Sequence, residues 1–253
     1  MAKKKKTAKK NKTMLYSLFV LLIFTATAGQ MDLSKVDWSE PSSIIKAFEF
    51  ARSSLINYGQ LKDIPEYDGE HSVVTLNHNQ PDFTEESLSL KGGTWQKFSL
   101  LDHLNRVGPA EALLHQSMMP TKERGDISNV YPTGWKQKKL SDGTWLYNRS
   151  HLIAFRFSGE NENWRNLFTG TQQMNQEAMT EYEEKVATYL RKTNNHVRYR
   201  VTPYFKENEL VPRGVQMEAQ SVEDNNLHFN VFLYNIQEGY QINYETGSSK
   251  KIR

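Results

Sequence analysis

Four segments of β-type sequence follow one another between His196 and Tyr244, and this run constrains the fold more than any other feature of the chain. The first, HVRYRVTPYF at 196–205, alternates in polarity as a half-buried strand does. The others are 215–222, 227–235 and 240–244, with Glu238-Gly239 as a turn. Strands joined by short connections pair in antiparallel order. The segment therefore predicts an antiparallel sheet.

Helical spacing appears before this run. The stretch EAMTEYEEKVATYLR at 177–191 places its apolar residues on one side of a helix. The leucine-rich spacing over 99–118 also favours a helix, interrupted by Gly108-Pro109, and Ile44 opens a short amphipathic helix after Pro41. Residues 73–77 read as a strand. We therefore expect an α+β fold, with a central antiparallel sheet flanked by helices.

The N-terminus has the anatomy of a secretory signal. Seven lysines within residues 1–12 precede the uncharged apolar run MLYSLFVLLIFTATA, and Ala26-Thr27-Ala28 offers a cleavage site. An uncleaved signal anchor is the alternative, and both interpretations place the rest of the chain outside the cytoplasm as a secreted or cell-surface protein. We divide the chain into residues 1–28 (signal peptide or anchor), 29–60 (helical or linker segment) and 61–253 (the main domain).

The charge and the lack of cysteine restrict the function. Without the first 28 residues, 25 of the 32 basic side chains remain against 29 acidic ones, so the exported part is about −4. A polyanion would have to be bound by local basic patches, because the overall field would not attract it. The absence of cysteine excludes disulfide scaffolds, cysteine-based zinc sites and a thiol nucleophile.

The residues that carry chemistry lie between Asn148 and Glu183. Hydrolysis of a phosphodiester needs a base for the water, for which a neutral histidine serves near pH 7, and His151 is the candidate. It also needs positive charge at the phosphoryl oxygens, which Arg149 and Mg²⁺ can supply. Mg²⁺ takes oxygen ligands and retains most of its waters, so the amide oxygen of Asn175 could suffice on the protein side.

The same residues resemble a known family. The segments YNRSHLIA at 147–154 and NLFTGTQQMNQ at 166–176, followed by Glu183, look like the DNA/RNA non-specific endonucleases with the ββα-metal fold, most closely their streptococcal DNA-entry and secreted DNase branch. Segments 79–81, 101–108, 132–135 and 197–203 are also similar, and the resemblance extends from about residue 64 to 244. It implies a ββα-metal motif at the sheet edge.

The resemblance also implies roles for individual residues. His151 corresponds to the general base, Arg149 to the arginine near the phosphate, and Asn175 to the metal ligand. Glu183 corresponds to the acidic residue behind the ion, and Asn166 to an asparagine nine residues before the ligand. The family motif Asp-Arg-Gly-His differs here at Asn148 and Ser150. The first change removes a negative charge, and the second restricts the backbone slightly.

Each assignment has a structural alternative. Asn175 could be a helix N-cap, Asn166 a turn residue, Glu183 an exposed helix acid, and Arg149 the partner of a carboxylate. Arg198 and Arg200 share one strand face and could bind nucleic acid or form internal ion pairs. Lys136, in a loop with Lys138 and Lys139, could contact phosphates or remain in solvent, as could Arg124.

The sequence thus predicts an exported, Mg²⁺-dependent endonuclease, with Mn²⁺ as an alternative ion, that cleaves DNA and RNA without regard to sugar and leaves 5′-phosphate ends. One rival is a cell-surface protein that captures DNA without cutting it, motivated by the altered residues 148 and 150. A weaker rival is a structural surface protein with a decayed site. The sequence leaves the oligomeric state and the biological role open.

Overall fold

The chain divides into two compact units, residues 1–58 and 59–253. The computed structural model describes residues 36–41, 43–44, 57–58 and 61–252. In the first unit, residues 43 and 44 are helical and Asn57–Tyr58 form the short strand β1. The predicted signal segment and most of the helix predicted after Ile44 lie outside the described residues. None of the described helices combines the length and apolarity needed to cross a membrane.

The second unit is built on an antiparallel sheet with the strand order β2-β9-β8-β7-β4-β3. The strands are β2 (Val73–Leu76), β3 (Trp95–Phe98), β4 (Ala110–Leu114), β7 (Val197–Tyr204), β8 (Gly214–Ser221) and β9 (His228–Tyr234). Two further hairpins pair β5 (Tyr147–His151) with β6 (Leu167–Thr171), and β10 (Tyr240–Ile242) with β11 (Ser249–Lys251). The expected α+β fold with a central antiparallel sheet is confirmed.

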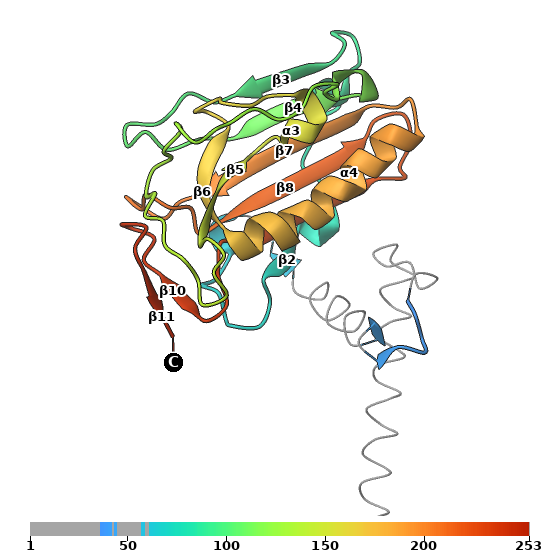
Figure 1. Cartoon of the computed structure of the whole chain (residues 1–253). Helices are drawn as coiled ribbons and strands as arrows, with labels where there is room; N and C mark the ends of the chain where they lie inside the picture. The colour runs from blue at the N-terminus through green and yellow to red at the C-terminus, as the bar shows by residue number, and fades with distance from the viewer. Residues whose placement is uncertain (1–35, 42, 45–56, 59–60, 253) are drawn as a thin grey trace, which may run out of the picture. The chain divides into compact units, whose positions relative to one another are not determined.

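Helix α4 (Thr180–Lys192) lies across one face of this sheet, over β7 and β8 (Figure 1). Its buried residues Tyr182, Val186 and Leu190 pack against Val197, Tyr199 and Val201 of β7 and against alternate residues of β8 and β9. The helix continues a π-helical turn, η6 (Met174–Met179). The remaining helical segments are short: α3 (Phe155–Ser158), η2 (Leu61–Asp63), η3 (Asn77–Asn79), η4 (Glu86–Leu88) and η5 (Gln116–Met118).

The helix predicted over 99–118 is wrong. Residues 99–109 form a connection in which Asp102 accepts backbone N–H groups of Leu104 and Arg106, and residues 110–114 form β4. This strand lies between β3 and β7, and Leu113 is as fully buried as Ala112 and Leu114 on the opposite face. A strand buried on both faces lacks the alternation that identifies strands, so its apolar spacing resembled a helix. Strands β3 and β11 were not predicted either.

Candidate active site

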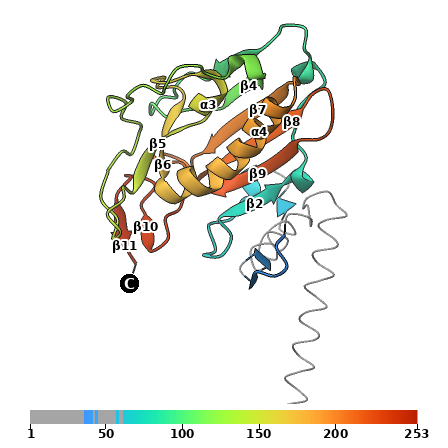
Figure 2. The ribbon, with the colours of Figure 1, turned by 45° about the vertical axis from the view of Figure 1, so that its right-hand side comes forward.

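The strands β5 and β6 form a hairpin that leads directly into the helix η6–α4, which is a ββα arrangement (Figure 2). In the antiparallel register, His151 lies opposite Leu167 and Asn148 opposite Gly170. A Cβ atom on Gly170 would lie 2.2 Å from the Ser150 Oγ atom, so a larger residue at 170 would clash with the Ser150 side chain. The hairpin therefore places His151 at the end of β5, and the helix begins at residue 172, directly after β6.

His151 is held in one orientation. Its Nε2 atom lies 3.1 Å from the backbone oxygen of Asn161, so the Nε2–H group donates and Nδ1 is left as the acceptor. Burial, and to a lesser extent the positive charge of Arg124, lower the pKa of His151 to about 4, although the hydrogen bond to Asn161 acts in the opposite direction. The imidazole is therefore neutral at pH 7, as a general base must be.

Arg124 links His151 to Glu183 electrostatically. The positive charge of Arg124 acts on both side chains, and that of Arg156 acts on Glu183. Burial nevertheless raises the pKa of Glu183 to about 7, because desolvation outweighs the two arginines. Within the described part of the chain, the guanidinium of Arg124 has no hydrogen bond or ion pair, so it can accept an anionic ligand. The structure thus brings together three of the predicted residues.

Asn175 lies on the π-helical turn, one residue after Met174, whose Cε atom packs near Gly170. In an α-helix, residues eight apart are offset by roughly 80° around the axis. The wider π turn reduces that offset, so Asn175 and Glu183 lie closer to one face. The half-buried side-chain amide of Asn175 makes no hydrogen bond to the described residues, unlike a helix N-cap.

These donors fit a hard divalent cation in one respect. The unpartnered amide oxygen of Asn175 and the half-buried carboxylate of Glu183, on the same helix, are both oxygen donors, which Mg²⁺ prefers. Among the described residues, no group of three or more histidine, aspartate and glutamate side chains could hold a metal ion. An ion at Asn175 would therefore need water and substrate oxygens to complete its coordination.

The structure places Arg149 differently from the expected phosphate contact. Its Nε and Nη2 atoms donate to the backbone oxygens of Val130 and Ser128. Its guanidinium carbon also lies 4.4 Å from the Trp135 ring centre and 5.2 Å from that of Tyr131. The side chain thus anchors the loop 128–135 to β5, which gives it a positioning role.

Asn166 is likewise engaged in structure. It is fully buried, and its side chain accepts from the Ile153 N–H group and donates to the Ile153 oxygen, at 2.8 and 2.9 Å. These bonds fix the chain that follows His151 against the start of β6. Both polar atoms of the Asn166 amide group are thus bonded to the backbone, and burial keeps the side chain from a substrate.

Residues 148 and 150 point away from His151, since alternate residues of a strand face opposite sides. The Asn148 Nδ2 group donates to Gln172 Oε1 at 2.6 Å, just before the helix. The Ser150 hydroxyl is buried without a partner among the described residues. Neither side chain blocks the face that carries Arg149 and His151.

Arg198 and Arg200 form internal ion pairs, the second of the two roles considered for them. Arg198 pairs with Glu111, and Arg200 with the fully buried Glu218 at 2.7 Å. Both guanidinium groups also stack on Phe83. Because Tyr199 faces α4, these two arginines lie on the opposite face of the sheet. Lys136 is exposed beside the Trp135 loop and has no partner among the described residues.

Sequence reasoning missed two contributors to the site. The Asn161 carbonyl orients His151, but a backbone oxygen leaves no signal in residue type. Asn235 is buried, accepts from the Thr171 N–H group at 2.7 Å, and donates to the oxygens of Thr169 and Pro212 at 3.0 Å. It fastens β6 to the end of β9. The sequence around Asn235 contains no pattern that predicts these hydrogen bonds.

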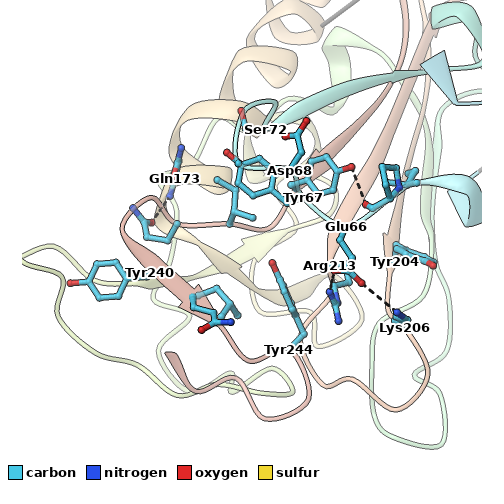
Figure 3. A pocket seen from close by; sticks show the side chains of 18 of the residues that line it. Glu66, Tyr67, Asp68, Ser72, Gln173, Tyr204, Lys206, Arg213, Tyr240 and Tyr244 are labelled. Atoms are coloured by element: carbon cyan, nitrogen blue, oxygen red, sulfur yellow. Dashed lines mark hydrogen bonds and ion pairs between the residues drawn. The ribbon is translucent and has the colours of Figure 1, made fainter. Parts of the chain in front are cut away.

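A cleft of about 1350 Å³ lies elsewhere, beside β10 and the segment 62–72 (Figure 3). Phe232 and Tyr234 in its wall lie on the sheet face opposite α4, because Val231 and Leu233 face the helix. Six acidic and three basic side chains line it, and two of the bases, Lys206 and Arg213, pair with Glu66. A nucleic acid would be repelled there, so size alone does not identify the active site.

Comparison with known proteins agrees with the ββα arrangement. The sequence model of the DNA/RNA non-specific endonuclease family matches residues 88–223. A deoxyribonuclease of Streptococcus dysgalactiae subsp. equisimilis is 33% identical over 129 residues, which are 48% of this chain and 38% of that relative's length.

Solved structures show the same fold. NucA from Streptococcus agalactiae without metal has a TM-score of 0.65 and 26% identity, over 76% of this chain and 92% of that one. Its magnesium-bound form has a TM-score of 0.63 and 27% identity, over 72% and 87%. The Sda1 nuclease with bound zinc has a TM-score of 0.56 and 24% identity, over 63% and 80%, and shows the fold alone. The family match covers more than half of the chain, so the resemblance is confirmed: this chain belongs to the DNA/RNA non-specific endonuclease family.

Proposed function

We propose that this protein is an exported, divalent-metal-dependent endonuclease that hydrolyses the phosphodiester bonds of DNA and RNA. The observation that carries the proposal is the buried, neutral His151, oriented by the Asn161 oxygen and facing the charge of Arg124. Family membership, and the deoxyribonuclease among the relatives, support the same activity.

In this mechanism, Nδ1 of His151 takes a proton from a water molecule that attacks the phosphorus. The P–O3′ bond breaks and the leaving oxygen takes a proton from a second water molecule, which leaves a 3′-hydroxyl and a 5′-phosphate. Arg124 neutralises charge on the phosphoryl oxygens, the task first assigned to Arg149, because Arg149 is committed to backbone oxygens. Arg149 and Asn166 position the segments on either side of His151.

Asn175 would hold the cation through its amide oxygen, with Glu183 behind it. When bound, Mg²⁺ would supply positive charge for the phosphoryl and leaving oxygens. The magnesium-bound form of NucA supports this choice of ion, and Mn²⁺ remains the alternative. Contacts to the nucleic acid backbone, with Lys136 among them, would make cleavage insensitive to sequence. Residues 1–28 would direct export, and the main domain would begin near residue 61.

The test is digestion of plasmid DNA and RNA in Mg²⁺ and in EDTA by the full chain and two histidine variants. We expect EDTA to abolish cleavage and His151→Ala to lower kcat by about 10²–10⁴-fold. The exposed His103 lies outside the site, so His103→Ala should cleave at the wild-type rate. Cleavage by His151→Ala at that rate would overturn the mechanism. Intact plasmid retarded on a gel in EDTA would instead favour the DNA-capture protein.

A further inference from the structure

The loop that Arg149 anchors presents an aromatic ring to solvent beside the active site. Tyr131 is a large aromatic residue, yet it is 60% exposed. The Arg149 guanidinium lies over its ring at 5.2 Å and over the Trp135 ring at 4.4 Å. One face of Tyr131 is therefore covered by a cation, and the exposed fraction shows that much of the remaining ring is open.

Tyr131 lies near the general base because it stacks on Arg149, a neighbour of His151 on β5. Arg149 and His151 are two residues apart on β5, so they share one face of the strand about 7 Å apart. Tyr131 stacks on that arginine, which sets the ring within roughly one further side-chain length of the general base. A strand whose phosphate lies at His151 would bring a neighbouring nucleotide to this ring.

The ring is also held in place before any ligand arrives. The Arg149 Nη2–H group donates to the Ser128 oxygen at 2.6 Å, and Nε–H donates to the Val130 oxygen, directly before Tyr131. Thr169 of β6 donates to the Thr133 oxygen at 2.8 Å on the other side of Tyr131. Both flanks of the residue are thus fixed to the ββ hairpin, so a ligand that stacks on it loses little affinity to ordering the loop.

We propose that Tyr131 is a stacking site for a nucleobase next to the scissile phosphate, and that it makes the enzyme favour unpaired nucleotides. This rests on the proposed function. A π-face is common to all bases, so stacking tolerates any sequence, in keeping with a non-specific nuclease. In a duplex, the bases stack on one another and cannot reach the ring. The ring would therefore contribute to binding of single strands and of frayed or gapped ends.

The experiment uses single-stranded oligonucleotides with one cleavable phosphodiester among methylphosphonate linkages. An abasic residue is placed at each position in turn beside that bond. For Tyr131→Ala on the intact strand, we expect KM to rise about 5- to 100-fold with kcat within about threefold of wild type. On the strand that is abasic at the stacking position, wild type and Tyr131→Ala should have the same KM. Tyr131→Phe and Tyr131→Trp should behave as wild type.

Trp145→Ala is the matched control. Like Tyr131, Trp145 is exposed (51%) and has a cation, Lys139, over its ring. It differs in position, because it precedes β5 and lies six residues before His151. Its loss should leave KM as in the wild type, both on the intact strand and on each abasic strand. Equal losses for Tyr131→Ala on intact strands and on every abasic strand, or no loss at all, would overturn the proposal. So would an unchanged ratio of single-strand to duplex cleavage in Tyr131→Ala.

A binding measurement separates this proposal from the proposed function. In His151→Ala, a 2-aminopurine at the stacking position should lose fluorescence on binding, and Tyr131→Ala in that background should restore it. Quenching without cleavage by the wild type would refute the nuclease mechanism alone. Cleavage by the wild type with no Tyr131-dependent quenching would refute the stacking site alone.

Discussion

At the scale of single residues, the site works through two opposed pKa shifts. Burial lowers the pKa of His151 to about 4 and raises that of Glu183 to about 7, so the base is neutral while the acid titrates near neutrality. His151 is then ready to accept a proton over the whole range above about pH 5. Any loss of activity between pH 8 and pH 6 should come from protonation of Glu183.

Glu183→Gln tests this assignment. We expect kcat/KM of the wild type to rise with pH through about 7, and the variant, which is less active, to lack that rise. The free energy of unfolding should also depend on pH. The raised pKa of Glu183 stabilises the folded state fully below the unfolded value near 4.5, and this stabilisation is lost as pH rises through about 7. In EDTA at pH 8, the free energy of unfolding of Glu183→Gln should therefore be about 1–3 kcal/mol higher than that of the wild type. At pH 4.5 the two values should be nearly equal.

Urea unfolding at the two pH values checks the stability part, with Glu181→Gln as the control. Glu181 is exposed on the same helix and pairs with Lys185 at 2.8 Å, so its replacement should cost at most about 0.5 kcal/mol at pH 8. If Glu183→Gln raised the free energy of unfolding equally at both pH values, burial would not be destabilising the ionised form of Glu183.

At the scale of elements, the β5–β6 hairpin is not hydrogen-bonded into the large sheet, so other contacts must hold the hairpin against it. Asn235 provides one such contact. Its buried side-chain amide accepts a hydrogen bond from Thr171 of β6 and donates to the backbone oxygens of Thr169, also in β6, and of Pro212, just before β8. Asn235→Ala leaves three backbone groups without partners. We expect it to lower the free energy of unfolding by about 2–4 kcal/mol. It should also lower kcat of the folded protein, because the hairpin carries His151.

Asn230→Ala is the comparison that isolates the second effect. Asn230 is also buried on β9, and its amide bonds the Gln80 oxygen and Gln216 on the face away from α4. It should lose similar stability in denaturant titrations but retain kcat at a temperature where both variants are folded. Equal kcat for the two variants would mean that Asn235 supports the fold without aligning the site.

The elements also show where sequence patterns sufficed. The strands β7, β8 and β9 lie within one or two residues of their predictions. The second half of β7 alternates, and turn residues on either side bound β8 and β9, although β9 is buried on both faces. Strand β4 was mistaken for a helix because both of its faces are buried. The roles of Arg149 and Asn166 were inferred from motif position, which fixes a residue's place on the hairpin but not which backbone oxygens its side chain reaches.

At the scale of the whole molecule, acidic and basic side chains are distributed unevenly. The chain after residue 28 carries a net charge of about −4, and its large cleft is lined by an excess of acids. Near the ββα motif, Arg124 acts on His151, and Lys136 follows Trp135, which stacks on Arg149; neither basic side chain forms an ion pair with a carboxylate among the described residues. We therefore expect these two charges to bind the phosphate backbone close to His151.

The most direct measurement is chemical rescue of His151→Gly in single-turnover cleavage of an oligonucleotide with Mg²⁺. Removal of the imidazole should lower the rate by about 10²–10⁴-fold, and added imidazole should restore part of it, with a pH dependence that follows the added base. His103→Gly should need no rescue. A wild-type rate for His151→Gly, or a loss that imidazole of any concentration leaves unchanged while the variant remains folded and binds DNA, would contradict the assignment of His151 as the general base.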